Sequence, residues 1–306
     1  MFATSIHPTR PLAHRLYNRV MGIRPRVLND TSARGGTAPA DLLHTMADAI
    51  SAVKAVAFAA GRVDYGTLRG SAAYADYRAA AGWLAEADLS VLQSDAERTA
   101  FWINLYNMLA IDVVLTSGAA SIQDAGDAFF GPGYVVGGHF YTLHDIEQGL
   151  LRANAGYPGL PGPQFRADDP RLGQARTTVD ARIHFALVCA AMSCPPIRLY
   201  EAARLDNQLD LATQSFVNSG EVTINTEAQT ATLSKIFQWY APDFGAGFAV
   251  TAGFGDARPI LRWVAPYLTD ASTREAVLAS SDAYRVTFRK YDWALNAASV
   301  PVAVGV

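Results

Sequence analysis

The sequence predicts an α+β fold, in which a mainly helical single domain carries a small antiparallel sheet. Half of the 306 residues are hydrophobic and 17% are charged, so the chain can bury a large core. Alanine-rich or capped stretches indicate helices, and short stretches between turn residues indicate strands. We expect a flexible leader over residues 1–37, a single globular domain over 38–297 and a C-terminal tail over 298–306.

The clearest predicted helix runs from about Ala96 to Thr116. Ser94 and Glu97 have the spacing of a capping box, and Gly118 follows the last apolar position as a stop signal. Two helices should precede it, over residues 39–61 with Gly61 as C-cap and over residues 71–84.

The second half of the chain is predicted from the same signals. We expect a hairpin with Val135-Val136 and Phe140-Tyr141, then a helix from a Thr142–Asp145 cap to Arg152 and a connection over 153–179. A helix over 183–192, stopped by Pro195-Pro196, and a helix over 199–218 should follow. The last predicted elements are paired strands at 222–225 and 230–233, helices near 259–268 and 272–279, and a strand over 284–291.

Composition excludes several classes of partner. The net charge is −3 and the basic residues are scattered, which argues against nucleic-acid binding. No stretch reaches the roughly 18 apolar residues of a membrane helix, and the first residues lack a hydrophobic signal core. Two cysteines fit a reducing, cytoplasmic compartment. The six histidines have no metal-site spacing, and the glycines near residue 250 fit no nucleotide motif, so we expect no metal or cofactor.

Two asparagines lie on an otherwise apolar helix face. Asn104 and Asn107 are three residues apart, so their side chains share one side of the predicted helix. A buried amide without hydrogen bonds costs about 1–3 kcal/mol. Both amides therefore need specific partners, which are either the backbone of a neighbouring loop or a ligand.

The stretch from Arg182 to Pro196 contains two reactive residue types. Pro195 could begin a helix, which would place Cys194 at its N-cap, where the helix dipole favours a thiolate. Cys189 is interpreted as an inert buried thiol. On one helix the two cysteines would lie about 140° apart, so a mutual disulfide is not expected. His184 lies ten residues before Cys194 and could act as its base, and the alternative is a core histidine beside a packing cysteine.

An acidic residue could orient the His184 imidazole. Glu147 and Asp292 are the candidates because both stand in apolar or aromatic surroundings, and Glu147 is preferred. Each could instead form an ion pair with Arg152 or Arg182, which we include as binding residues with Asn104, Asn107 and Asp292.

Five segments in this order resemble the family known as domain of unknown function 547, over roughly residues 60–297. They are ERTAFWINLYNMLAIDVVL (97–115), FYTLHDIEQGLLR (140–152), DARIHFALVCAAMSCPPIRLYEAARLDNQLDLATQSFVN (180–218), LSKIFQWYAPDFG (233–245) and YDWALN (291–296). The Ser-Cys-Pro-Pro run ending at Pro196 resembles a bacterial-type subgroup. Plant members are similar but have serine in place of Cys194 and keep a cysteine that matches Cys189.

Three functions are compatible with these residues. The first is a cysteine-dependent hydrolase or acyl transferase, in which Cys194 attacks a carbonyl, His184 moves the proton, Glu147 orients the imidazole, and Asn104 or Asn107 donates to the oxyanion. This would suit a papain- or transglutaminase-like fold. The second is a non-catalytic binding or scaffold module for a small molecule or peptide, and the third is a thiol redox-sensitive protein.

Overall fold

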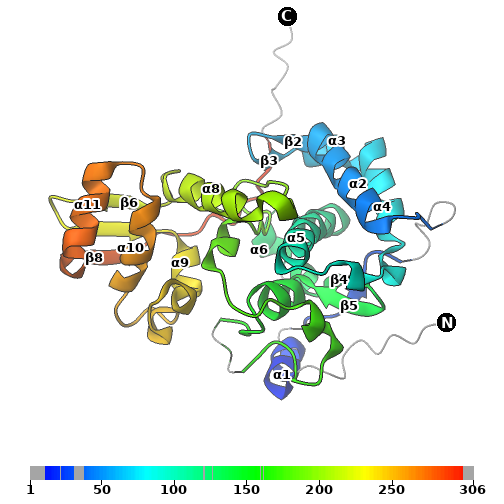
Figure 1. Ribbon diagram of the computed structural model, residues 1–306, viewed down its shortest axis with the longest axis horizontal. Helices are drawn as coiled ribbons and strands as arrows, with labels where there is room; N and C mark the ends of the chain where they lie inside the picture. Colours follow the sequence, from blue (N-terminus) through cyan, green and yellow to red (C-terminus); the bar gives the residue numbers. More distant parts are fainter. Residues whose placement is uncertain are drawn as a thin grey trace, which may run out of the picture.

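The structure, a computed structural model, describes residues 11–20, 22–30, 38–119, 121–125, 127–158, 160 and 162–298. It is mainly helical with small sheets of two or three strands, so the predicted α+β class is confirmed (Figure 1). The α-helices are α1 (Leu12–Val20), α2 (Leu42–Ala57), α3 (Tyr65–Arg69), α4 (Ala72–Ala81), α5 (Asp95–Ser117), α6 (Ile122–Ala125), α7 (Asp127–Phe130), α8 (Leu205–Val217), α9 (Lys235–Trp239), α10 (Arg258–Val264) and α11 (Ala271–Ser280). The strands are β1 (Arg26–Val27), β2 (Phe58–Ala59), β3 (Arg62–Val63), β4 (Pro132–Val136), β5 (His139–Thr142), β6 (Thr223–Asn225), β7 (Thr230–Leu233) and β8 (Arg285–Phe288).

Helix α5 lies in the interior and begins and ends as the sequence predicts. The side chain of Ser94 accepts from the backbone N–H of Glu97, whose carboxylate accepts from the backbone N–H of Ser94, and Gly118 ends the helix in a left-handed conformation. Among the described helices, α5 alone has the length and composition to cross a membrane, but 83% of its apolar window is buried inside the molecule. Such burial is typical of a core helix.

Part of the expected N-terminal leader belongs to the folded structure. Within the described residues, α1 is helical and β1 pairs in parallel with β4. Asn29 is buried and donates to the carbonyls of Ala81 and Val135, both at 2.9 Å. The prediction of an irregular leader is therefore wrong for residues 12–20, which form a helix, and for residues 26–29, which hydrogen bonds to distant elements order. Residues 1–10 and 299–306 lie outside the described part.

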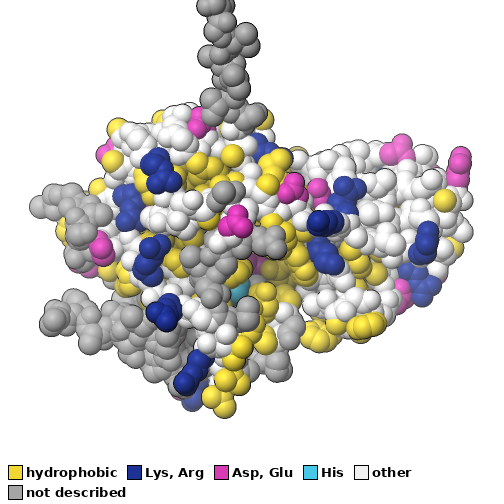
Figure 2. Space-filling view, turned by 180° about the vertical axis from the view of Figure 1, so that it is seen from behind, with side chains coloured by type: hydrophobic (Ala, Val, Ile, Leu, Met, Phe, Trp, Pro, Cys, Tyr) yellow, Lys and Arg dark blue, Asp and Glu magenta, His cyan; other side chains and the backbone are white. Residues whose placement is uncertain are grey.

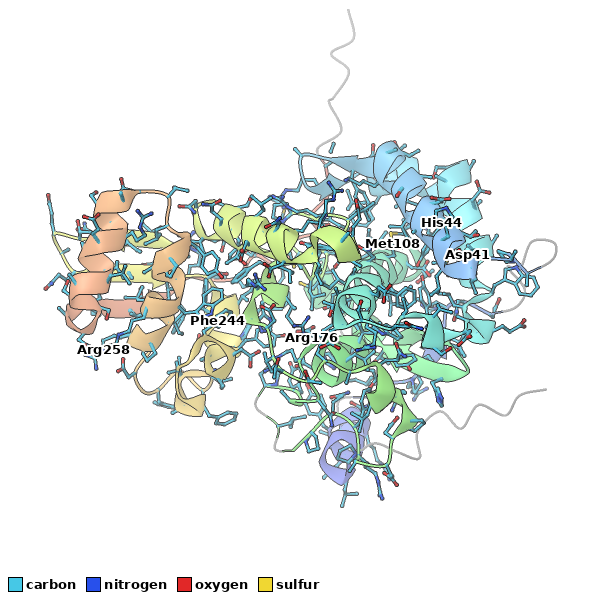
Figure 3. The ribbon with its side chains drawn as sticks, in the orientation of Figure 1. Asp41, His44, Met108, Arg176, Phe244 and Arg258 are labelled. Carbon is cyan, nitrogen blue, oxygen red and sulfur yellow. The ribbon has the colours of Figure 1, made fainter. Side chains whose placement is uncertain are left out.

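Helix α2 ends earlier than the sequence predicts. Asp41 caps its start by accepting from the backbone N–H of His44 at 3.0 Å (Figure 3). The helix ends at Ala57, and Gly61 lies in the turn of the β2–β3 hairpin instead of capping the helix. Its φ is +76°, and a Cβ there would lie 2.5 Å from Cβ of Pro196. Glycine is therefore needed for the close approach of the hairpin to Pro196.

The predicted hairpin around Gly137 is confirmed, but the sheets are not purely antiparallel. Strands β4 and β5 pair antiparallel, as do β6 and β7. In the described residues two strands add a parallel pairing, β1 with β4 and β8 with β7. Both sheets are mixed because the added strand comes from a distant part of the chain. Helices α10 and α11 lie beside the β6–β7–β8 sheet, away from α2 and α4 (Figure 1).

The helix predicted over residues 183–192 is not formed. A short 3₁₀ helix, η6 (Ala181–Phe185), is followed by irregular chain, and Ala190 has a left-handed φ of +64°. The backbone N–H of Met192 donates to the carbonyl of Ala294, and that of Asn296 donates to the carbonyl of Ala190, both at 2.8 Å. These long-range bonds to the C-terminal segment replace the local bonds of a helix. The predicted helix over 199–218 is η7 (Ala202–Arg204) followed by α8.

The remaining site elements are short helices. A π-helix, η4 (Asp145–Leu151), follows the Thr142–Asp145 cap, in which Thr142 and Asp145 bond reciprocally. The others are the 3₁₀ helices η5 (Pro170–Gln174) and η8 (Ala241–Phe244). The buried apolar residues form one cluster that reaches from Leu28 to Tyr291. A single globular domain over residues 38–297 stays a prediction.

Replacing Gly149 in η4 by alanine tests the packing that holds this π-helix. A Cβ at Gly149 would lie 2.1 Å from Cε2 of the fully buried Phe165, whereas a Cβ at Gly173 in η5 meets no atom within 4 Å. We expect Gly149→Ala to lower the free energy of unfolding by about 1–3 kcal/mol through overpacking. Gly173→Ala should change it by less than about 0.5 kcal/mol. Urea denaturation measures both, and equal values would contradict the close packing.

Candidate functional site

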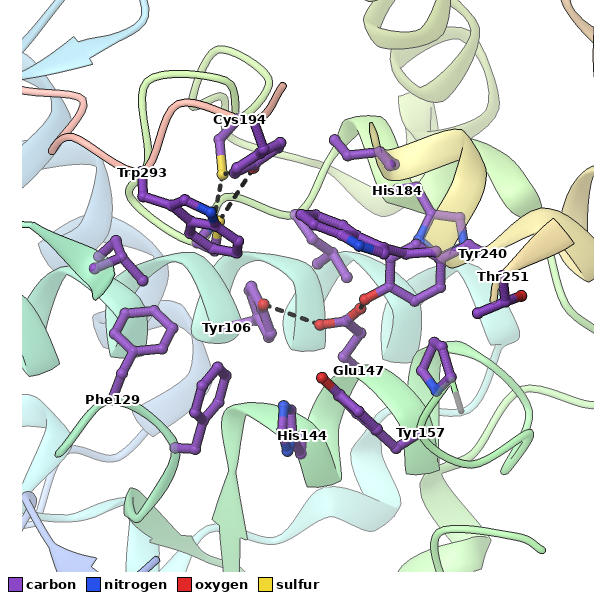
Figure 4. Close-up of a pocket in the computed structure, with 18 residues that line it drawn as sticks. Tyr106, Phe129, His144, Glu147, Tyr157, His184, Cys194, Tyr240, Thr251 and Trp293 are labelled. Atoms are coloured by element: carbon purple, nitrogen blue, oxygen red, sulfur yellow. Dashed lines mark hydrogen bonds between the residues drawn. The ribbon is translucent and has the colours of Figure 1, made fainter. Parts of the chain in front are cut away.

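A cavity of about 460 Å³ lies between α5, the π-helix η4, helix α9 and the C-terminal segment (Figure 4). Eight of its eighteen lining residues are aromatic. The lining residues are Tyr106, Ile122, Phe129, Phe130, His144, Glu147, Tyr157, Pro158, His184, Leu187, Cys189, Cys194, Ile236, Trp239, Tyr240, Thr251, Tyr291 and Trp293. Figure 2 shows hydrophobic side chains around a recess in the middle of one face, with a histidine in it. A mostly apolar cavity with a few polar groups is typical of a small-molecule site.

His184 is held by an aspartate that the sequence analysis did not select. Nε2 of His184 lies 2.7 Å from Oδ2 of Asp243, which is on η8. Arg152 binds the same carboxylate with two parallel hydrogen bonds of 2.7 Å each. The imidazole stacks on the ring of Tyr240, with centroids 4.0 Å apart. These contacts fix the orientation of the imidazole, so Asp243 has the role predicted for Glu147.

Burial and hydrogen bonding set the protonation of this group. Burial lowers the pKa of His184 and outweighs the hydrogen bond to Asp243, which would raise it. Burial by itself would raise the pKa of Asp243, but hydrogen bonds from His184 and Arg152 hold it well below its usual range. At neutral pH the imidazole is therefore neutral, with its Nε2–H donating to the Asp243 carboxylate. Arg152 supplies the compensating positive charge for Asp243.

Glu147 stands on the cavity wall but does not orient His184. Its carboxylate accepts from the hydroxyl of Tyr106 at 3.0 Å and from the hydroxyl of Tyr240. The π-helix η4 presents this side chain, which is 7% exposed. π-helical turns often occur at functional sites. The prediction that Glu147 orients His184 is wrong, because Nε2 of His184 bonds to Asp243 and the Glu147 carboxylate bonds to the two tyrosines.

The two cysteines lie together beside Tyr291. The Tyr291 hydroxyl is 3.1 Å from Sγ of Cys194 and 3.4 Å from Sγ of Cys189, and the backbone N–H of Cys189 donates to Sγ of Cys194 at 3.1 Å. Both thiols are free. The expectation that they point apart is wrong because it assumed one continuous helix. Cys194 also does not cap a helix, since the next helix along the chain begins only at Ala202.

The contacts between the two thiols give them opposite acidities. Hydrogen bonding with the Cys194 thiol lowers the pKa of Cys189, and the Tyr291 hydroxyl adds to this against the effect of burial. Burial raises the pKa of Cys194, and the neighbouring Cys189 raises it further. The contacts therefore favour Cys189 as the thiol of the pair that gives up its proton first. The interpretation of Cys189 as an inert thiol does not fit this environment.

His184 and the cysteines face the same cavity without touching. The hydrogen bonds described for His184 lead to Asp243, and those for the thiols lead to each other and Tyr291. Figure 4 shows Cys194 and His184 on different sides of the pocket. The predicted Cys194–His184 pair is not formed in this structure.

Both asparagines of α5 bind loop backbone, which was one of the two predicted alternatives. Asn104 donates to the carbonyl of Tyr200 at 2.8 Å and accepts from its N–H at 2.9 Å. Asn107 donates to the carbonyl of Ala186 at 3.0 Å and accepts from the N–H of Val188 at 2.8 Å. Their amides are therefore occupied, which removes the predicted role as oxyanion donors.

Two further predicted residues lie away from the cavity. Arg182 pairs with Asp180, Asp206 and Asp210 at 2.7–2.8 Å, in a partly exposed ion cluster. Asp292 is exposed, and its carboxylate accepts from the backbone N–H of Ala294. Neither residue contributes a side chain to the cavity wall. Their neighbours in the sequence suggested a role in the site, but in the fold the side chain of Arg182 lies in an ion cluster and Asp292 is exposed.

The residues that sequence reasoning missed are Asp243, Tyr291, Tyr106, Tyr240 and Trp239. Four of them stand in the segments LSKIFQWYAPDFG and YDWALN, but no local spacing connects them to His184 or the cysteines. Tyr106 lies on α5 like the two asparagines, but its hydroxyl donates to the Glu147 carboxylate. In the part of the chain that the structure describes, no group of three or more His, Cys, Asp or Glu could hold a metal ion.

Comparison with known proteins gives one result. Residues 89–217 match the family model described as "Protein of unknown function, DUF547". This stretch includes Glu147, His184 and both cysteines, whereas Asp243 and Tyr291 follow it. No curated protein matches the chain, and no solved structure matches it either. The match shows that residues 89–217 are similar to this family, and the family description names no activity.

Replacing His184 by glutamine tests its neutral state. Because the pKa of His184 is lower in the folded protein than the roughly 6.5 of an unfolded chain, stability is complete above pH 6.5 and decreases as the pH falls below it. The loss can reach about 1.4 kcal/mol per pH unit. His184→Gln should flatten this slope between pH 7 and 5, while His139→Gln, on the exposed hairpin turn, should keep it. Urea denaturation at several pH values measures the slope, and an unchanged slope in His184→Gln would contradict burial of a neutral imidazole.

Proposed function

We propose that the protein is a cysteine-dependent hydrolase or acyl transferase that acts on a small molecule or short peptide in the cavity. One observation carries this proposal: two adjacent thiols, of which Cys189 has a lowered pKa, line the same cavity as a neutral imidazole oriented by a buried aspartate. Titratable groups with perturbed pKa values gather in catalytic sites. Two free thiols in the cavity also support a reducing, cytoplasmic compartment.

Cys189 is the proposed nucleophile, and Cys194 and Tyr291 are the groups that support its thiolate. The sulfur attacks the carbonyl carbon of an ester, thioester or amide, and the electron pair of the C=O bond moves to oxygen. When the carbonyl re-forms, the bond to the leaving group breaks, and the leaving group takes the proton of the neighbouring Cys194 thiol. The product of this half-reaction is a thioester on Cys189.

His184 is the proposed base for the second half-reaction. Its Nε2–H is directed to Asp243, so Nδ1 is the nitrogen that can accept a proton. Water in a hydrolase, or an alcohol or amine in a transferase, gives a proton to Nδ1 as it attacks the thioester. The C–S bond breaks and leaves the Cys189 thiolate, and a bridging water carries the proton from the imidazole to the Cys194 sulfur, which restores one thiolate and one thiol. The bridging water is needed because His184 and the thiols do not touch.

A second candidate function is thiol redox chemistry, which the contact between Cys189 and Cys194 favours. With a hydroperoxide as oxidant, the Cys189 thiolate attacks the terminal oxygen, giving a sulfenic acid and releasing an alcohol or water. The Cys194 thiol then attacks that sulfur, water leaves, and a disulfide forms. Both sulfurs lie within 3.4 Å of the Tyr291 hydroxyl, which supports this step by placing them side by side.

Alkylation of the thiols tests the proposed nucleophile. We expect iodoacetamide to label Cys189 at a pH below the roughly 8.5 of an ordinary thiol, because hydrogen bonding stabilises its thiolate. In Cys194→Ala the donor thiol is absent, so labelling of Cys189 should require a higher pH, and mass spectrometry of the peptides measures this. Hydrolysis of a panel of activated esters should be lost in Cys189→Ser and in His184→Gln. Two outcomes would overturn the assignment of Cys189. One is that iodoacetamide labels Cys194 before Cys189, and the other is that Cys189→Ser keeps full esterase activity.

Oxidation of the purified protein tests the second candidate. We expect stoichiometric hydroperoxide to remove both thiols together and to lower the mass of the monomer by two hydrogen atoms, because the sulfurs are neighbours. Cys194→Ser should instead leave a sulfenic acid on Cys189, which a dimedone probe traps. Dimers linked between molecules, or further oxidation of one sulfur beside an intact second thiol, would contradict an internal disulfide.

A further inference from the structure

We infer that the part of the cavity around Glu147 binds the ammonium group of a small cationic ligand. The inference rests on the proposed function only in that this ligand would be the substrate, and the binding itself needs neither thiol. It assigns a chemical class to the molecule that the cavity accepts.

The first argument is the charge on the cavity wall. Glu147 is the one acidic side chain among the described residues that line the cavity, and that lining contains no lysine or arginine. A carboxylate on an apolar wall without a basic neighbour attracts a cation strongly, because little water screens it. His144, which stacks between Phe130 and Tyr157, is the other titratable side chain near this part of the wall, together with His184.

The second argument is that Arg152, which interacts electrostatically with Glu147 and lies 5.0 Å from the centroid of the Tyr240 ring, gives its hydrogen bonds to another carboxylate. Arg152 is committed to Asp243 through two hydrogen bonds of 2.7 Å. Burial keeps His184 neutral at physiological pH, so it adds no positive charge. The group of Glu147, Asp243 and Arg152 therefore has one negative charge in excess. Buried charges in proteins are normally paired, so a positively charged ligand is the expected complement.

The third argument is the aromatic surroundings of the carboxylate. Figure 4 shows Tyr106, Tyr157, Tyr240 and His144 around Glu147. Aromatic faces attract ammonium groups, and cages of such rings recognise methylated ammonium ligands. The hydroxyls of Tyr106 and Tyr240 donate to Glu147 and hold it in one orientation. The carboxylate and the rings together form a site that suits a compact cation better than a neutral or anionic group.

The rest of the cavity limits the other end of the ligand. Beyond Glu147 the wall consists of apolar and aromatic side chains, including Phe129 and Trp293, and reaches the cysteines (Figure 4). A volume of about 460 Å³ holds a small molecule. The ligand class is therefore an amine or quaternary ammonium compound with an apolar or acyl group that extends toward the thiols.

A pair of probes with the same shape and different charge tests the inference. Choline and 3,3-dimethylbutan-1-ol differ in the replacement of the ammonium nitrogen by carbon. We expect wild-type protein to bind choline at least about tenfold more tightly, as measured by titration calorimetry and by the fluorescence of Trp239 and Trp293. Glu147→Gln, which keeps the shape of the side chain, should abolish this preference. Glu227→Gln, in the exposed turn between β6 and β7, should keep it.

The outcomes separate the ammonium site from the thiol chemistry. Cys189→Ser should bind choline as wild type does, so loss of activity with retained binding would count against neither proposal. Equal binding of the two probes to wild type, tighter binding of an anion such as benzoate, or an undiminished preference in folded Glu147→Gln would overturn the ammonium site. If Glu147→Gln fails to fold by circular dichroism, the comparison of the two probes on wild type still decides the question.

Discussion

The two asparagine amides of α5 are the contacts on which the site depends. Asn107 holds the backbone at Ala186 and Val188, and Asn104 holds it at Tyr200, so both ends of the intervening segment are fixed to the central helix. Each amide uses a donor and an acceptor, which satisfies buried backbone groups that a helix would otherwise pair internally. This explains why an apolar, alanine-rich stretch remains irregular. Both cysteines lie within this fixed segment and line the cavity.

The C-terminal segment completes the arrangement. Its backbone pairs with the chain around Ala190 to Ser193, and it brings Tyr291 beside the two sulfurs and Trp293 to the cavity wall. On the other side, Arg152 at the end of the π-helix holds Asp243, and Asp243 holds His184. The cavity is therefore closed by segments that are far apart in sequence. Its thiol end and its acidic end are fixed by independent sets of bonds.

This division gives the two ends different chemistry. The thiol pair and Tyr291 form a weakly polar group in which the pKa of Cys189 is lowered and the pKa of Cys194 is raised. The Glu147 end has a fixed carboxylate among aromatic rings and one negative charge in excess. A ligand that spans both ends would be anchored by its charge and would present a neutral group to the sulfur. Ligand binding and bond formation would then use different residues, and His184 would accept the proton of the water, alcohol or amine that attacks the thioester.

The sequence by itself determined the local structure: the capping box of α5, the glycine-directed β4–β5 hairpin, the pairing of β6 with β7 and the helices near the C-terminus. These features depend on residues a few positions apart, whose side chains and backbone interact directly. The sequence also selected Glu147, His184 and the cysteines as residue types. Only the tertiary structure decided their partners, because Asp243 lies 59 positions from His184 and Tyr291 lies 97 from Cys194. Residues so far apart meet only when the chain folds. The long-range hydrogen bonds that bring them together also take the place of the local bonds of the helix predicted over residues 183–192.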